Sequence, residues 1–149
     1  MAQVLRRRGR IQVRLSHLER DALLGIVAEL SPQLPRVRDR ISQAYDDAER
    51  QAEYARWVKP DFVAGCEADL SVVTDSLSSG EDTLPLTDAQ ALAWLRALSH
   101  LRRAAASELG IEADGWEEQA DESTRNSREF GILMALGYIQ EELVAALES

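Results

Sequence analysis

Few side chains in this sequence belong to the types on which catalysis or metal binding depends. The chain has two histidines, His17 and His100, and one cysteine, Cys66. A Cys/His zinc site needs four such ligands. A di-iron helical bundle needs a Glu-x-x-His pair on each of two helices, yet neither histidine has a Glu three residues before it. A catalytic triad needs a histidine that a third group orients, whereas both histidines are expected on ordinary helix surfaces. We therefore expect no metal and no cofactor.

Acidic residues are numerous, but their spacing does not indicate acid–base catalysis. Asp46-Asp47 and Glu117-Glu118 are adjacent pairs, and adjacent residues of a helix point in different directions. A catalytic carboxylate pair also needs burial that separates its two pKa values, so a solvated face is the favoured interpretation. The sequence contains no phosphate-binding Gly-rich loop, Walker lysine or dinucleotide fingerprint. We expect a protein that is not an enzyme.

The residues that suit binding lie in three charged segments. Residues 1–14 contain no acidic residue and five arginines, namely Arg6, Arg7, Arg8, Arg10 and Arg14. Residues 36–49 alternate in charge, which favours orientation and fast association; the candidate protein contacts there are Arg36, Arg38, Arg40, Tyr45, Asp46 and Asp47. Residues 108–122 contain seven acids and no base around Trp116. This tryptophan either covers the core or anchors a partner protein, because aromatic residues are enriched among interface hot spots.

Length and charge define the kind of molecule that positions these residues. The chain has 149 residues, of which 17 are Lys or Arg and 26 are Asp or Glu, with a net charge of -9. Residues 1–14 carry +5, so residues 15–149 carry -14. A chain of this length can bury a core without disulfides, and we expect one domain over residues 1–149. An acidic body repels phosphate backbones, so nucleic acid could bind only through residues 1–14.

The first residues do not resemble a targeting signal. Residues 1–10 are rich in arginine and lack the apolar stretch of a secretory signal. No segment reaches the 18 consecutive apolar residues that indicate a membrane span. We therefore expect a cytoplasmic protein with no membrane contact.

The basic arm, residues 1–15, is expected to form a β-hairpin. Residues 11–15 alternate between apolar and polar types, and Gly9 precedes them where a tight turn needs positive φ. Residues 4–5 could form the second strand. Because an isolated hairpin is marginal in water, the apolar face of residues 11–15 is expected to lie on the helical body. A disordered basic tail through Arg10 is the alternative.

Residues 16–147 are expected to form a mainly α body, a bundle of five to six helices. Capping boxes mark two helix starts, at Ser16 with Glu19 and at Thr87 with Gln90. Pro60 suits the first position of another helix, shorter helices are expected at 36–42 and 46–58, and the last helix spans 128–147.

Apolar spacing indicates how these helices pack. The first helix has its apolar stripe at Leu18, Ala22, Leu23, Ile26, Val27 and Leu30. The last helix is apolar almost all round and is therefore expected at the centre of the domain. Residues 78–85 are a loop by composition, and residues 111–127 form an acidic loop without periodicity.

Three segments carry a resemblance to a known family. They are Arg36-Val37-Arg38-Asp39-Arg40-Ile41 with Ala44-Tyr45-Asp46-Asp47-Ala48-Glu49, then Trp94-Leu95-Arg96-Ala97-Leu98, and finally Gly137-Tyr138-Ile139-Gln140-Glu141. On these segments the chain resembles the actinobacterial AosR-like oxidative-stress regulators, long catalogued as domain of unknown function 2017, over nearly its full length.

The resemblance implies a cytosolic, non-enzymatic regulator linked to transcription or stress. It would act by protein contact with a stress sigma factor or RNA polymerase. Genes of this family often lie near the Clp protease adaptor, so a role as an accessory protein of the Clp system is an alternative. A nucleic-acid-binding protein that uses the basic arm is another, and a homodimer is compatible with each.

The redox function of that family depends on a closely spaced N-terminal cysteine pair. This chain has no cysteine before Cys66, so an intramolecular thiol switch cannot operate. Cys66 shares an apolar stripe with Leu70 and Val73, and we expect it to be buried and inert rather than a redox site.

Overall fold

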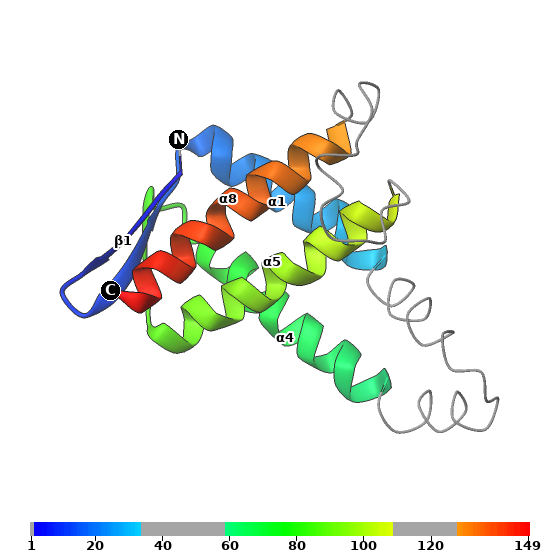
Figure 1. The fold of residues 1–149 in the computed structure, drawn as a ribbon, viewed down its shortest axis with the longest axis horizontal. Coiled ribbons are helices and arrows are strands. Elements are labelled where there is room, and N and C mark those ends of the chain that lie inside the picture. Colours follow the sequence, from blue (N-terminus) through cyan, green and yellow to red (C-terminus); the bar gives the residue numbers. More distant parts are fainter. Residues whose placement is uncertain (1, 34–58, 109–127) are drawn as a thin grey trace.

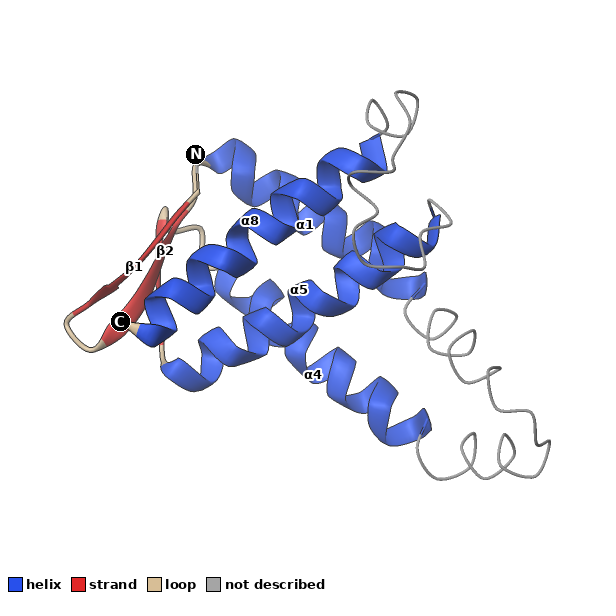
Figure 2. Cartoon of the chain, viewed as in Figure 1, coloured by secondary structure: helices blue, strands red, loops and turns tan. Residues whose placement is uncertain are grey.

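The computed structural model describes residues 2–33, 59–108 and 128–149, which form a helical body with a small sheet at one end (Figure 1). Figure 2 shows the strands beside the ends of α5 and α8. In chain order the elements are β1 (Gln3–Arg7), β2 (Arg10–Arg14), α1 (His17–Leu30), a 3-10 turn (Ser31–Gln33), α4 (Lys59–Leu77), β3 (Thr83–Leu86), α5 (Asp88–Glu108) and α8 (Arg128–Glu148).

The mainly α class is confirmed, whereas the count of five to six helices is not supported by the described residues. The described residues contain four α-helices. The two short helices expected at 36–42 and 46–58, like the acidic loop expected at 111–127, lie outside the described residues. The helix expected from Pro60 is confirmed as α4.

The expected hairpin is confirmed, and the alternative of a disordered tail is wrong. β1 and β2 pair antiparallel with Arg7 opposite Arg10, so the turn has two residues. Arg8 and Gly9 form it with φ of 54° and 76°, as a type I′ turn requires. Val4, Ile11 and Val13 point toward the helices and are buried.

The expectation of a loop over residues 78–85 is corrected, because this segment ends in a third strand. β3 pairs antiparallel with β2, and the order in the sheet is β1-β2-β3. Leu84 and Leu86 are buried at 2% and 1% exposure, and this burial stabilises a strand of only four residues. The sequence did not indicate this strand because it contains Pro85, and proline is typical of turns and, within sheets, of edge strands.

Both capping boxes are confirmed. Ser16 Oγ accepts from the Glu19 amide at 3.2 Å while the Glu19 carboxylate accepts from the Ser16 amide at 3.0 Å. Thr87 Oγ1 and the Gln90 side chain make the same exchange at 3.1 and 2.9 Å. These bonds satisfy amides that helix starts leave without intrahelical partners, and they fix where α1 and α5 begin.

The apolar stripe expected on α1 is partly wrong. Leu23, Val27 and Leu30 are buried, but Leu18 is 82% exposed and Ala22 is exposed. Arg20 is buried instead and donates to the Glu81 carbonyl at 3.0 Å. The polar head of this arginine therefore ties α1 to the loop before β3, and the inward face is rotated away from Leu18.

The central helix is α5 and not α8, which corrects the expectation from α8's apolar composition. α5 contacts α1, α4, α8 and the sheet, and its residues Trp94, Leu98 and Leu101 are fully buried. α8 packs on α5 and β1, and it leaves Met134 and Val144 exposed at 39% and 42%. Apolar composition alone therefore did not identify the helix with most neighbours.

One helix of the described residues, over Phe130–Glu148, has the length and composition that a membrane span requires. Core helices of soluble proteins meet the same criterion. In this fold the buried side of that helix packs on α5 and β1, so the observation does not assign it to a membrane.

Candidate functional site

The outer side of the sheet collects the arginines that the sequence singled out. Strand alternation places Val4, Ile11 and Val13 inward and the residues between them outward. Arg7 and Arg10 are directly paired across β1 and β2, and Arg14 lies farther along β2 opposite Gln3. We define the arginine face as Arg7, Arg8, Arg10 and Arg14, all of them exposed.

The arginine face contains no acidic residue of its own. Its remaining outward positions on the three strands are Gln3, Leu5, Gln12, Thr83 and Pro85. Within the described residues, none of its four arginines makes an ion pair or a side-chain hydrogen bond. Asp82, on the loop just before β3, is directed to His17 and Arg20 on α1. Like charges in directly opposed positions destabilise a sheet. The arginines of the arginine face therefore lower the stability of the sheet unless a partner neutralises their charge.

Arg6 differs from its neighbours because it points toward the helices. Its Nε donates to the Ala146 carbonyl at 3.2 Å, and its Nη1 lies 3.2 Å from Asp88 Oδ1. The side chain is only 25% exposed. A cation near the last turn of α8 also suits the negative end of the helix dipole. Arg6 therefore joins β1 to α8 and α5 and does not belong to the arginine face.

The other candidate contacts, Arg36, Arg38, Arg40, Tyr45, Asp46, Asp47 and Trp116, lie outside the described residues. Cys66 lies in α4 and is 4% exposed in the core, which confirms the expectation that it is buried. Among the described residues, no group of three His, Cys, Asp or Glu side chains could hold a metal ion.

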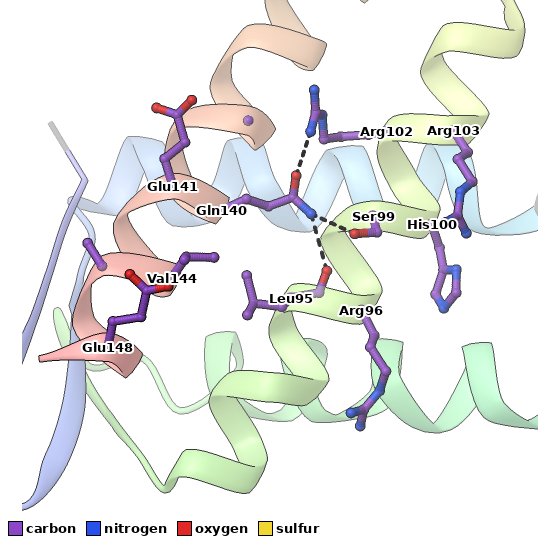
Figure 3. A pocket seen from close by; sticks show the side chains of 12 residues that line it. Leu95, Arg96, Ser99, His100, Arg102, Arg103, Gln140, Glu141, Val144 and Glu148 are labelled. Atoms are coloured by element: carbon purple, nitrogen blue, oxygen red, sulfur yellow. Dashed lines mark hydrogen bonds between the residues drawn. The ribbon is translucent and has the colours of Figure 1, made fainter. Parts of the chain in front are cut away.

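A groove of about 780 Å³ between α5 and α8 is a second candidate site, and the sequence did not predict it. Figure 3 shows Gln140 reaching from α8 toward α5. Its oxygen accepts from Arg102 Nη1 at 2.8 Å, and its nitrogen donates to Ser99 Oγ at 2.8 Å and to the Leu95 carbonyl at 3.2 Å. Gly137 leaves room beside the Arg102 guanidinium, 3.6 Å from where a Cβ would lie.

Asp69 of α4 organises the cations at the other side of α5. It is 9% exposed and accepts from Arg96 Nε and Nη2 at 3.1–3.2 Å. His100 Nε2 lies 3.7 Å from Asp69 Oδ2, and its side chain is only 14% exposed. The expectation that His100 is an ordinary surface histidine is therefore wrong.

The electrostatic environment of His100 favours its neutral form. Burial lowers its pKa below the ordinary value of 6.5, and the positive charge of Arg103 lowers it further, while Asp69 opposes both effects. The reason for the burial is the position of His100 on the face of α5 that turns toward α4.

The groove does not combine these groups into a catalytic arrangement. Gln140 and Ser99 are bonded to each other and to α5, and Arg96 is bonded to Asp69. Two acids of α8, Glu141 and Glu148, also line the groove. The polar groups therefore fix the packing of three helices, whereas the arginines of the arginine face have no ionic partner among the described residues.

One of the comparisons with known proteins identifies the family. The family model described as Domain of unknown function (DUF2017) matches residues 1–147. The chain belongs to the DUF2017 family. No curated protein and no solved structure matches it, so the finer resemblance to AosR-like regulators remains a proposal.

Sequence reasoning found the arginines of this DUF2017 chain but missed Asp69 and Gln140. Both are polar residues on faces that are otherwise apolar: Asp69 precedes Leu70 and is one turn from Val73, and Gln140 lies between Leu136 and Leu143. A polar residue inside an apolar stripe needs a buried partner. That signal could have identified both positions, although not their partners.

Proposed function

We propose that this DUF2017 protein is a non-enzymatic binding module that contacts an acidic surface of a partner protein through its arginine face. One observation carries the proposal: Arg7, Arg10 and Arg14 share the exposed side of the sheet without acidic partners in the described part of the chain. Unpaired like charges held close together repel one another. An acidic partner would remove this repulsion, so the arrangement favours binding over stability.

The residues around the arginines also suit a protein partner. Leu5 is 39% exposed on the same side of the sheet, and Pro85 is exposed on β3. Arginine is enriched in protein interfaces because its guanidinium binds carboxylates with two hydrogen bonds and also packs on apolar groups. A mixed patch of arginine and apolar side chains would therefore give both charge complementarity and apolar contact.

The finer part of the proposal rests on the resemblance to the AosR-like regulators. We propose a cytoplasmic regulator linked to transcription or stress, with a sigma factor, RNA polymerase or a Clp component as its partner. Each of these would need an acidic patch that matches the arginine face.

The proposal is tested by affinity capture from cell lysate followed by mass spectrometry. The bait is the full chain and a variant with Arg7→Gln, Arg10→Gln and Arg14→Gln. Three lost charge contacts at roughly 0.5–1 kcal/mol each predict capture weakened about tenfold or more. The control is Arg103→Gln, which changes an exposed arginine on α5 away from the sheet and should leave capture intact.

Equal capture by the triple variant would overturn the proposal. Recovery of neither sigma factor, polymerase nor Clp components would remove the finer partner assignment. Binding of duplex DNA that decreases steeply with salt, and that the triple variant loses, would instead support the nucleic-acid alternative.

A further inference from the structure

The hydrogen-bond pattern of the sheet shows which backbone groups point outward at its edges. Arg7 and Arg10 flank the two-residue turn, so they are a hydrogen-bonded pair. Bonding then alternates along the strands, and the N–H and C=O groups of Val4 and Arg6 point away from β2. The Leu15 amide, which bonds the Asp82 carbonyl at 2.9 Å, confirms this alternation, because odd-numbered residues of β2 face β3.

The two edges of the sheet differ in whether they can accept another strand. On β3 the outward-pointing backbone groups belong to Thr83 and Pro85, and Pro85, which lies opposite Gln12, has no N–H to donate. Proline on an edge strand is a common device that prevents further pairing. On β1, Val4 and Arg6 each have an N–H donor and a C=O acceptor that point outward. In the described part of the chain these groups make no backbone hydrogen bond. The β1 edge is therefore open where the β3 edge is blocked.

The open edge adjoins the arginine face. Leu5 and Arg7 of β1 point to the outer side of the sheet, and the Arg8-Gly9 turn lies at the end of the strand. A strand added at β1 would place alternate side chains next to these residues. Acidic side chains at those positions would pair with Arg7 and Arg8, and an apolar side chain would contact Leu5.

We propose that β1 accepts an extended, acidic segment of the partner protein as a fourth strand of the sheet. The inference rests on the proposed function, and it adds the mode of binding. Main-chain hydrogen bonds to Val4 and Arg6 supply affinity, and the arginine face selects acidic side chains, as in other cases of β-strand addition. A second copy of this chain fits poorly, because pairing two β1 strands would bring two arginine faces onto one continuous sheet.

The first experiment uses an eight-residue peptide of alternating Glu and Val with blocked ends. Amide hydrogen exchange of the full chain is followed by NMR at millimolar peptide. We expect slower exchange of the Val4 and Arg6 amides. The matched control is the same peptide with N-methyl groups at alternate residues, on the side that would face β1. It keeps the charge but loses at least two hydrogen bonds, so its affinity should decrease about tenfold.

A second experiment changes the protein. Val4→Pro removes an outward donor without removing a bond to β2, and edge strands tolerate proline where the N–H faces outward. We expect peptide affinity to decrease about tenfold in Val4→Pro, while Val4→Ala, which reduces the same side chain but retains the donor, binds like the wild type. Circular dichroism confirms folding of each variant, and the N-methyl peptide tests the proposal on the wild type alone.

The outcomes separate the inference from the proposed function. Equal binding of the N-methylated and unmodified peptides would overturn strand addition and leave a purely electrostatic contact. No binding of the unmodified peptide at millimolar concentration would also overturn strand addition, and the capture experiment would still test the arginine face. Tighter binding of duplex DNA than of the peptide would overturn both.

Discussion

At the scale of single residues, His100 shows how burial decides chemistry. The side chain lies between Asp69 of α4 and the arginines Arg96 and Arg103 of α5. Desolvation and the positive charges of Arg103 and Arg96 together oppose its protonation more than Asp69 supports it. The result is a buried polar group that is neutral at pH 7 and becomes charged only at a cost to the fold.

His100 makes stability depend on pH. Its pKa is lowered in the folded state, so below about pH 6.5 the unfolded chain binds more protons than the folded one. We expect the free energy of unfolding to decrease as pH falls from 7.5 to 5.5, and the decrease to be smaller in His100→Gln. Urea denaturation at the two pH values measures it, with His17→Gln as the control on an exposed histidine. An unchanged slope in His100→Gln would contradict the assignment.

At the scale of elements, replacing glycine by alanine is expected to have opposite effects on stability at two positions. Gly25 lies in the middle of α1 with nothing within 4 Å of an added Cβ, whereas Gly9 has a φ of 76° in the β1–β2 turn. Alanine is the better residue in a helix, but its Cβ is strained in the left-handed region.

Gly25→Ala should therefore increase the free energy of unfolding by about 0.5–1 kcal/mol. Gly9→Ala should decrease it by about 1 kcal/mol. Each variant is the control for the other, because both add one methyl group at an exposed site. Thermal and urea unfolding measure the two changes; a loss of stability in Gly25→Ala would show that α1 does not behave as an ordinary exposed helix at that point.

Elements with strong local signals were predictable from the sequence. Ser16 and Thr87 each begin a capping box, which predicts the starts of α1 and α5. Gly9 lies in the turn between β1 and β2, so the hairpin too could be expected from neighbouring residues alone. β3 could not, because Leu84 and Leu86 become a strand only by packing beside Ile11 and Val13, some 70 positions away. The arginine face was visible as charge, but Arg6 could be separated from it only through Ala146 and Asp88.

At the scale of the whole molecule, α5 connects the layers. It packs against α1, α4, α8 and two strands. Removing apolar side-chain atoms from its buried side therefore affects every part of the core. Its opposite side is in solvent, where Leu92 is 46% exposed.

A matched pair of leucines on α5 tests this arrangement. Leu101 is 0% exposed, and Leu101→Ala should lower the free energy of unfolding by about 2–5 kcal/mol because it leaves a cavity. Leu92→Ala removes the same atoms from the exposed side and should change it by less than about 0.5 kcal/mol. Chemical denaturation of both variants measures the difference; equal losses would place α5 elsewhere than at the centre.

The bonds between β1 and α8 have a consequence for the order of folding during protein synthesis. Tyr138 donates to the Ala2 carbonyl and Arg6 to the Ala146 carbonyl, across 136 and 140 positions of sequence. The ribosome releases β1 long before α8 exists, and a free hairpin is marginal in water. Contacts of such high sequence separation slow folding. The sheet, whose edge and arginines have no partner among the described residues, can therefore dock only after α8 has been translated.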